Sequence, residues 1–323
     1  MTRWFLALPL LAAPLSPLPG QTPSDRPALD RFRDSLAAVH DTASLRRLRH
    51  ALTRQREDDP VTALRAALAA VRLAELGADP DVSEARGDLR RLTKRESGWP
   101  YAWHALAVAE MRRATWERAS PLALGSRVGT GALEHALEDE QRALAADPGY
   151  LPAALTLADL ALGLRDTARY AGARDALRRA DAARDGAPAE LLLARGRLER
   201  AAGETDSAAA VFTRASRVPA DPRTGLARLE LARTLLGCGA VGGVGAGDST
   251  YFDAAVVDDS AVVAGYRADL VPIATDADLA RFDAAHGAGR AGFLRRFWAD
   301  RDRVELRRDG ERLREHYRRL LYA

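Results

Sequence analysis

The sequence predicts an all-α protein: a helical-hairpin solenoid, then a linker and a short helical C-terminal segment. Three observations favour this fold class. Alanine, leucine and arginine are frequent in the 323-residue chain, whereas aromatic residues make up only 6%. Apolar residues recur at helical spacing along most of the chain. Similar segments also return with a period of about 34 residues between residues 99 and 237.

The first 20 residues have the layout of a secretory signal peptide. Arg3 gives a positive start, residues 4–15 are apolar, and small residues and prolines lead to a polar run from Gln21. The prolines argue against a membrane-spanning helix, because each removes a backbone donor. We therefore expect an exported protein, periplasmic or extracellular, whose mature chain begins near Gln21. Retention of residues 1–20 as an uncleaved anchor is the alternative.

Helical hairpins are expected directly after this segment. Residues 21–58 form N-terminal helices, because apolar residues such as Phe32 and Leu36 fall on one helical face. The solenoid is expected over residues 59–237. Its first helix has Asp59 as a cap and Pro60 at the first helical position, and Gly77 ends it.

The segment 189–215 carries the clearest repeat. Gly196 stands at a small-residue position of a first helix, Gly203 at a turn and Ala208 at a small-residue position of a second helix, with Phe212 and Ala215 at later packing positions. The spacing from Gly203 to Gly237 is again 34 residues. This pattern resembles a tetratricopeptide (TPR) repeat, a non-enzymatic fold that binds protein partners.

The TPR resemblance spans residues 99–237 and includes an inserted segment at 120–135. It implies close helix contact at Gly196 and Ala208, and an exposed Ala189 at the start of the repeat. It also implies a concave surface lined by first helices. The repeat register gives this surface six partner-binding candidates: Tyr101, His104, Arg112, Thr156, Arg197 and Arg200.

A glycine-rich stretch follows the repeats. Gly237, Gly239 and Gly242 fit G-x-G-x-x-G, and Asp258 and Asp259 follow about where a dinucleotide-binding fold has its ribose-binding acid. That fold needs a strand before the glycines and a helix after them. The preceding residues have helical spacing, and the glycines disfavour a following helix. We therefore expect a linker at 238–250, with residues 237–249 mobile and binding no dinucleotide. A second match, from Gly287, also follows a helical pattern.

Residues 251–323 differ from the repeats and are rich in arginine. They resemble the start of a GWxTD domain, found in exported bacterial proteins. The namesake motif is absent, so we expect either a truncated domain or one whose downstream part has been lost. The residues that carry this resemblance are Phe297, Trp298, Arg301, Asp302, Gly310, Glu311, Leu313, Glu315, His316, Tyr317, Arg318, Arg319, Tyr322 and Ala323. Phe297 and Trp298 are expected to anchor a core, His316 to lie at its boundary, and Glu315 and Arg319 to form an i,i+4 pair.

The sequence favours a binding protein over an enzyme. Cys238 is the only cysteine, which excludes an internal disulfide and a cysteine-based metal cluster. The acids and histidines fit no metal-ligand spacing, and no nucleophile motif is found, so we expect no catalytic residue, cofactor or metal. The predicted function is an exported scaffold that binds a protein or peptide partner, without a small-molecule substrate or nucleic acid. The alternative is an envelope or polyanion-binding protein that uses the arginine-rich C-terminal helices.

Overall fold

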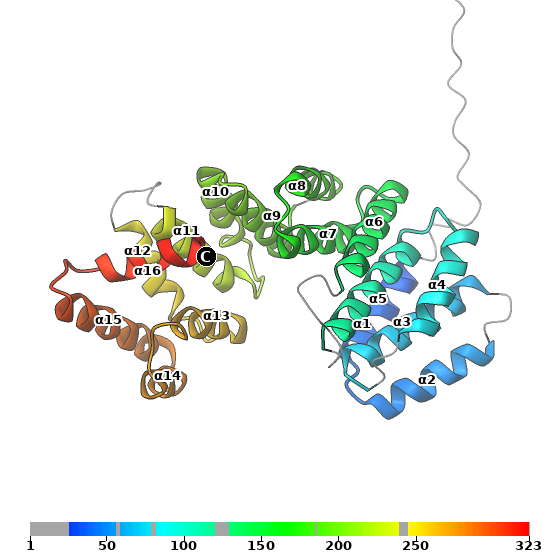
Figure 1. The fold of residues 1–323 in the computed structure, drawn as a ribbon, viewed down its shortest axis with the longest axis horizontal. Coiled ribbons are helices and arrows are strands. Elements are labelled where there is room, and N and C mark those ends of the chain that lie inside the picture. The colour runs from blue at the N-terminus through cyan, green and yellow to red at the C-terminus, as the bar shows by residue number, and fades with distance from the viewer. Residues whose placement is uncertain are drawn as a thin grey trace, which may run out of the picture. The chain divides into compact units, whose positions relative to one another are not determined.

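The computed structural model describes residues 26–55, 59–78, 82–119, 129–184, 186–238 and 245–322. Within these ranges the protein is all-α, with sixteen helices and no strand, and helical hairpins stack as in a TPR-like solenoid within each part of the chain (Figure 1). The expected signal peptide and most of the inserted segment at 120–135 lie outside the described residues. None of the helices in the described part is both long and apolar enough to span a bilayer.

The chain forms two compact units, residues 1–146 and 147–323. The helices of unit 1 are α1 (Arg26–Ala38), α2 (Thr42–Gln55), α3 (Pro60–Glu75), α4 (Ser83–Arg95), α5 (Pro100–Ala119) and α6 (Thr130–Ala146). Those of unit 2 begin with α7 (Leu151–Leu164), α8 (Thr167–Ala182), α9 (Ala189–Ala201), α10 (Thr205–Ala215), α11 (Thr224–Cys238) and α12 (Ala246–Ala254). Unit 2 ends with α13 (Ser260–Leu270), α14 (Asp276–Asp283), α15 (Gly287–Val304) and α16 (Glu311–Tyr322).

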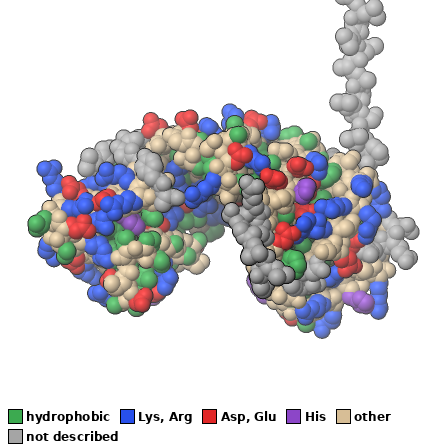
Figure 2. All heavy atoms as spheres, viewed as in Figure 1, with side chains coloured by type: hydrophobic (Ala, Val, Ile, Leu, Met, Phe, Trp, Pro, Cys, Tyr) green, Lys and Arg blue, Asp and Glu red, His purple; other side chains and the backbone are tan. Residues whose placement is uncertain are grey.

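Each unit contains stacked helical hairpins. In unit 1, α3 pairs with α4 and α5 with α6, and α5 packs against both helices of the preceding hairpin. In unit 2 the same pattern relates α7 and α8 to α9, and α9 and α10 to α11. The first helices therefore lie next to one another within a unit, as expected for a solenoid. Figure 2 shows acidic and basic side chains interspersed over the surface in this view.

The expected helix signals are confirmed at α3. The Asp59 carboxylate accepts hydrogen bonds from the backbone N–H groups of Val61 and Thr62, both at 3.1 Å, and Pro60 opens the helix. Gly77 lies just beyond the end of the helix with φ +68°. A left-handed residue at this point favours glycine because it has no Cβ to clash.

The repeat register is confirmed at Gly196. A Cβ atom at this position would lie 2.5 Å from the Phe212 ring, so only glycine lets α9 and α10 approach this closely. Ala208 is fully buried in the same seam. The expectation for Ala189 is wrong: it is also fully buried, because the turn after α10 covers the start of α9. The Asp221 carboxylate there accepts a hydrogen bond from the Ala189 N–H at 3.3 Å.

The C-terminal helices share a core with the solenoid. Leu229, Ala232 and Leu236 of α11 pack into the same buried cluster as α12 to α16. The expected domain boundary at residues 237/238 therefore does not coincide with the division into compact units. This core holds most of the aromatic residues of unit 2, and Phe297 and Trp298 are buried in it as expected.

The predicted linker at 238–250 is helical at both ends. α11 continues to Cys238, and α12 begins at Ala246 directly after Gly245, so the expectation that the glycines prevent a helix here is wrong. A Cβ at Gly237 would lie 2.1 Å from Cδ1 of Leu321 of α16, so the glycine leaves room for α16 to pack against α11 here. Residues 239–244 lie outside the described residues.

Candidate binding face of the solenoid

Three successive first helices of unit 1 enclose a pocket of about 200 Å³. Its floor is apolar, and four polar or charged side chains stand around it. The lining residues are Arg33, Leu36 and Ala37 of α1, Leu68, Val71, Arg72 and Glu75 of α3, and His104, Ala105 and Val108 of α5. We call this surface the α1–α3–α5 face. A concave, mostly apolar site with a few polar groups is the usual form of a binding pocket.

The structure brings two of the predicted residues to this face. His104 lines the pocket, and Arg112, two turns further along α5, donates a 3.1 Å hydrogen bond to Glu75 on its rim. Tyr101 packs beside the apolar core of unit 1, one turn before His104 on α5. The sequence alone does not identify Glu75, because only the fold shows that α3 and α5 are adjacent here.

Arginine side chains connect the helices around the pocket. Arg72 donates to Glu75 at 2.9 Å and to the carbonyl oxygens of Ala37 and Val39 at 2.9 and 3.3 Å, which ties the end of α1 to α3. Arg65, one turn before Leu68 on α3, lies over the Phe32 ring at 5.4 Å. Guanidinium groups commonly stack on aromatic faces in this way.

A buried acid of α6 holds the His104 ring in place. Its Nδ1 lies 2.8 Å from Oε1 of Glu140, which is fully buried. Burial raises the pKa of Glu140 to about 7, because the nearby His104 offsets only part of the cost of removing the carboxylate from water. The other carboxylate oxygen of Glu140 has no hydrogen-bond partner within the described residues.

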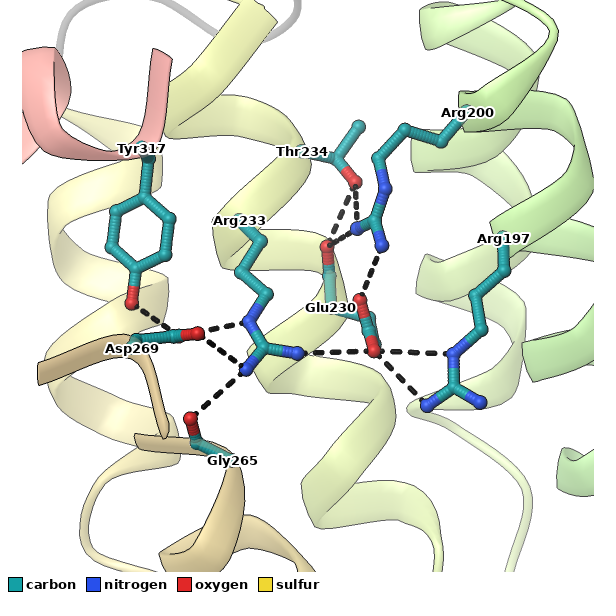
Figure 3. A network of polar contacts seen from close by, with 8 residues as sticks. All are labelled: Arg197, Arg200, Glu230, Arg233, Thr234, Gly265, Asp269 and Tyr317. Carbon is teal, nitrogen blue, oxygen red and sulfur yellow. Dashed lines mark hydrogen bonds and ion pairs between the residues drawn. The ribbon is translucent and has the colours of Figure 1, made fainter. Parts of the chain in front are cut away.

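The other predicted residues lie in unit 2. Thr156 is half-buried on α7. Arg197 and Arg200 of α9 both turn toward Glu230 of α11 (Figure 3). Arg197 donates to Glu230 Oε1 at 3.0 and 3.2 Å, and Arg200 pairs with Oε2 at 2.8 Å. These arginines thus join two neighbouring first helices.

Arg233 extends this cluster to the C-terminal helices. It donates to Glu230 at 3.2 Å, to the Gly265 carbonyl at 3.0 Å and to both oxygens of Asp269 at 2.8 and 2.9 Å (Figure 3). Tyr317 of α16 donates to Asp269 at 2.7 Å. Arg200 also donates to the Thr234 hydroxyl at 3.2 Å. We call these contacts the Glu230 network; its members are Arg197, Arg200, Glu230, Arg233, Thr234, Gly265, Asp269 and Tyr317.

The charges of the Glu230 network reverse the usual effect of burial. Burial alone would raise the pKa of Glu230, but Arg200, Arg233 and Arg197 lower it to about 2. The carboxylate is therefore charged whenever the protein is folded near neutral pH. The sequence gives one signal for such a residue: a glutamate inside an apolar helix with an arginine three residues later, as in Glu230–Arg233 and Glu110–Arg113.

The C-terminal arginines largely form ion pairs. Arg307 and Arg312 pair with both Glu305 and Glu315, and Arg319 pairs with Glu315 as expected. His316 is buried against Trp298 and Tyr317, so its expected place at the boundary of the core is wrong. Burial lowers the pKa of His316, and the nearby Asp269 offsets only part of this effect.

The acids near the glycine motif have structural roles. Asp259 caps α13 by accepting from the N–H groups of Ala261 and Val262, and Asp258 accepts from the Gly287 N–H at 3.2 Å. Gly237 lies inside helix α11, whereas a dinucleotide-binding fold has a strand before its first glycine. Across the described ranges, the structure contains no group of three or more His, Cys, Asp or Glu side chains placed to hold a metal ion.

No protein-family profile matches the chain, and no curated protein matches it. Among solved structures, the chain is similar to a thermophilic TPR protein from Thermus thermophilus. The two are 23% identical, the TM-score is 0.44, and the match covers 66% of this chain and 95% of the other.

Proposed function

We propose that the protein is an exported, non-enzymatic scaffold that binds a segment of a partner protein on the α1–α3–α5 face. The observation that carries this proposal is the pocket formed by three successive first helices, with the predicted residue His104 in its wall and Arg112 at its rim. Export rests on the sequence of residues 1–20 alone. Identification of the mature N-terminus of the exported protein tests it, and an intact Met1 in a cytoplasmic pool contradicts it.

The pocket suits one aliphatic side chain of a partner. Its floor consists of Leu, Val and Ala side chains. Complete burial of a leucine or valine stabilises a complex by about 1.5–3 kcal/mol, which is less than the cost of association. A partner segment must therefore also contact the polar rim, and Arg33, Arg72, Glu75 and His104 offer hydrogen bonds and charge there.

Filling the pocket tests the proposal. Val108 lines it and is only partly buried, so Val108→Trp places an indole in the space that a partner side chain would occupy. Val256→Trp is the matched control, since Val256 is an exposed valine of unit 2. The mature protein and both variants are used to capture proteins from the envelope fraction of the source cells. A partner retained by the wild type and Val256→Trp but lost with Val108→Trp supports the proposal. Equal capture by all three contradicts it.

A further inference from the structure

We infer that the α1–α3–α5 face accepts an acidic segment of a partner protein, with one aliphatic side chain in the pocket and carboxylates on either side of it. This inference rests on the proposed function and names the chemistry of the partner. It follows from the charges, the unsatisfied donors and the spacing of the arginines on this face.

Cations exceed anions on the α3 and α5 part of the face. Three arginines, Arg65, Arg72 and Arg112, stand against two acids there. Glu75 pairs with Arg72 and Arg112, and Asp59 at the start of α3 interacts electrostatically with Arg65. Arg33 of α1 is matched by Asp30 and Asp34. The face therefore presents a positive surplus next to an apolar floor, which favours a partner of opposite charge.

The same three arginines keep unused hydrogen-bonding capacity. The Nε atoms of Arg65, Arg72 and Arg112 are buried and have no hydrogen-bond partner within the described residues. A buried donor without an acceptor is unfavourable. A modest turn of each guanidinium toward a bound carboxylate would satisfy these donors. By contrast, the arginines around Glu230 already form ion pairs with acids of the protein itself.

The arginines lie at both ends of the pocket. Arg65 and Glu75 are ten residues apart on α3, about 15 Å along the helix, and Arg112 stands at the Glu75 end. The pocket residues Leu68, Val71 and Arg72 lie between them. An extended segment of five residues spans about 16 Å. One leucine flanked by two glutamates on each side therefore matches the face.

Labelled peptides with blocked termini test this chemistry on the mature chain. The first has a central leucine flanked by two glutamates on each side. The second replaces the glutamates with lysines, and the third replaces the leucine with serine. Fluorescence anisotropy measures their affinities. The glutamate–leucine peptide is expected to bind, and the other two to bind at least about tenfold more weakly.

Charge removal on the protein completes the test. Combined Arg65→Gln and Arg112→Gln should weaken binding of the glutamate–leucine peptide about five- to tenfold, and added salt should reduce the difference. Arg54→Gln is the matched control, because Arg54 is an exposed arginine of α2 away from the pocket. Circular dichroism melts confirm that the variants are folded.

The outcomes separate the two proposals. Absence of binding by the glutamate–leucine peptide, equal or tighter binding of the lysine peptide, or no effect of the arginine changes, overturns the acidic-segment inference. If Val108→Trp still abolishes capture of the natural partner in that case, the scaffold proposal stands. If Val108→Trp also has no effect, both proposals fail.

Discussion

Two buried glutamates show how differently the two units use their charges. Glu140 of unit 1 has one histidine beside it, and its pKa rises to about 7. Glu230 of unit 2 has three arginines around it, and its pKa falls to about 2. Both carboxylates lose water on folding, so the difference comes from the charge of their neighbours. A buried acid stabilises the fold only where its attraction to the surrounding cations exceeds the free-energy cost of its desolvation.

The contrast divides the predicted partner-binding residues. In unit 2, Arg197 and Arg200 hold α9 to α11 through Glu230. In unit 1, His104 and Arg112 stand at a pocket whose arginines outnumber its acids. We therefore propose that a partner binds in unit 1, and that the arginines of unit 2 mainly stabilise the fold.

The largest expected effect comes from removing Glu230. Glu230→Ala leaves Arg197, Arg200 and Arg233 facing one another without their shared acid, and should lower the free energy of unfolding by about 3–5 kcal/mol at pH 7. Glu140→Gln is the contrasting change. It removes a poorly compensated charge and keeps a hydrogen bond to His104, so it should alter stability by less than about 1 kcal/mol. Urea melts measure both, and equal losses would refute the comparison.

A packing contrast within unit 2 comes next. Gly196→Leu forces a side chain against the Phe212 ring and should cost about 1–3 kcal/mol. Gly172, inside α8, has open space around it, so Gly172→Ala should stabilise by about 0.5–1 kcal/mol. Chemical denaturation of both variants checks the signs. A stabilising Gly196→Leu would show that the α9–α10 seam is not close-packed.

The two glutamates should also give opposite pH dependences. The folded-state pKa of Glu140 lies above its unfolded value near 4.5, so the folded protein binds the proton more tightly between pH 4.5 and 7. Its contribution to stability therefore falls as pH rises through this window, by about 2–3 kcal/mol. Glu230 contributes in the other direction: its stabilisation is present above pH 4.5 and is lost as pH falls toward 2.

The contribution of each glutamate is isolated by subtracting the stability of its variant from that of the wild type at each pH. Stability is measured from pH 3 to 8 for the wild type, Glu140→Gln and Glu230→Gln. The difference between the wild type and Glu140→Gln should change between pH 4.5 and 8. Glu230→Gln should leave that difference intact and remove part of the acid sensitivity below pH 4.5. A wild-type and Glu140→Gln difference that does not vary with pH would mean that Glu140 titrates normally.

The smallest effect is expected at the edge of the Glu230 network. Tyr317→Phe removes the 2.7 Å hydrogen bond to Asp269 while keeping the buried ring, and should cost about 1 kcal/mol. Asp269 keeps its two bonds from Arg233, which limits the loss. Thermal melts compare the variant with the wild type. A loss as large as that of Glu230→Ala would place the centre of the network at Asp269 instead.

The sequence predicts most of the fold because local signals set it. The Asp59–Pro60 start of α3 and the small residues at Gly196 and Ala208 depend on neighbours within one hairpin, and each is found as expected. Ala189 and His316 are buried, contrary to expectation, because residues far from them in the sequence cover them. The helix at Ala246 likewise forms where α12 packs on α11, which local glycine content does not reveal.

The candidate site is less predictable than the fold. Repeat register places His104 and Arg112 on first helices, but the pocket needs α1 as its third wall, and only packing shows this. The same register places Arg197 on a first helix without revealing that Glu230 occupies its guanidinium. Charge pairing between repeats is therefore the information that the sequence pattern lacks.

Hydrogen–deuterium exchange tests the division between the units most directly. The mature chain is compared with and without a saturating amount of the glutamate–leucine peptide. Binding on the α1–α3–α5 face predicts slower exchange confined to α1, α3 and α5, with α9 and α11 unchanged. Slower exchange at α9 and α11, with none at α3 and α5, would show that Arg197 and Arg200 form the binding face and would contradict the assignment to unit 1.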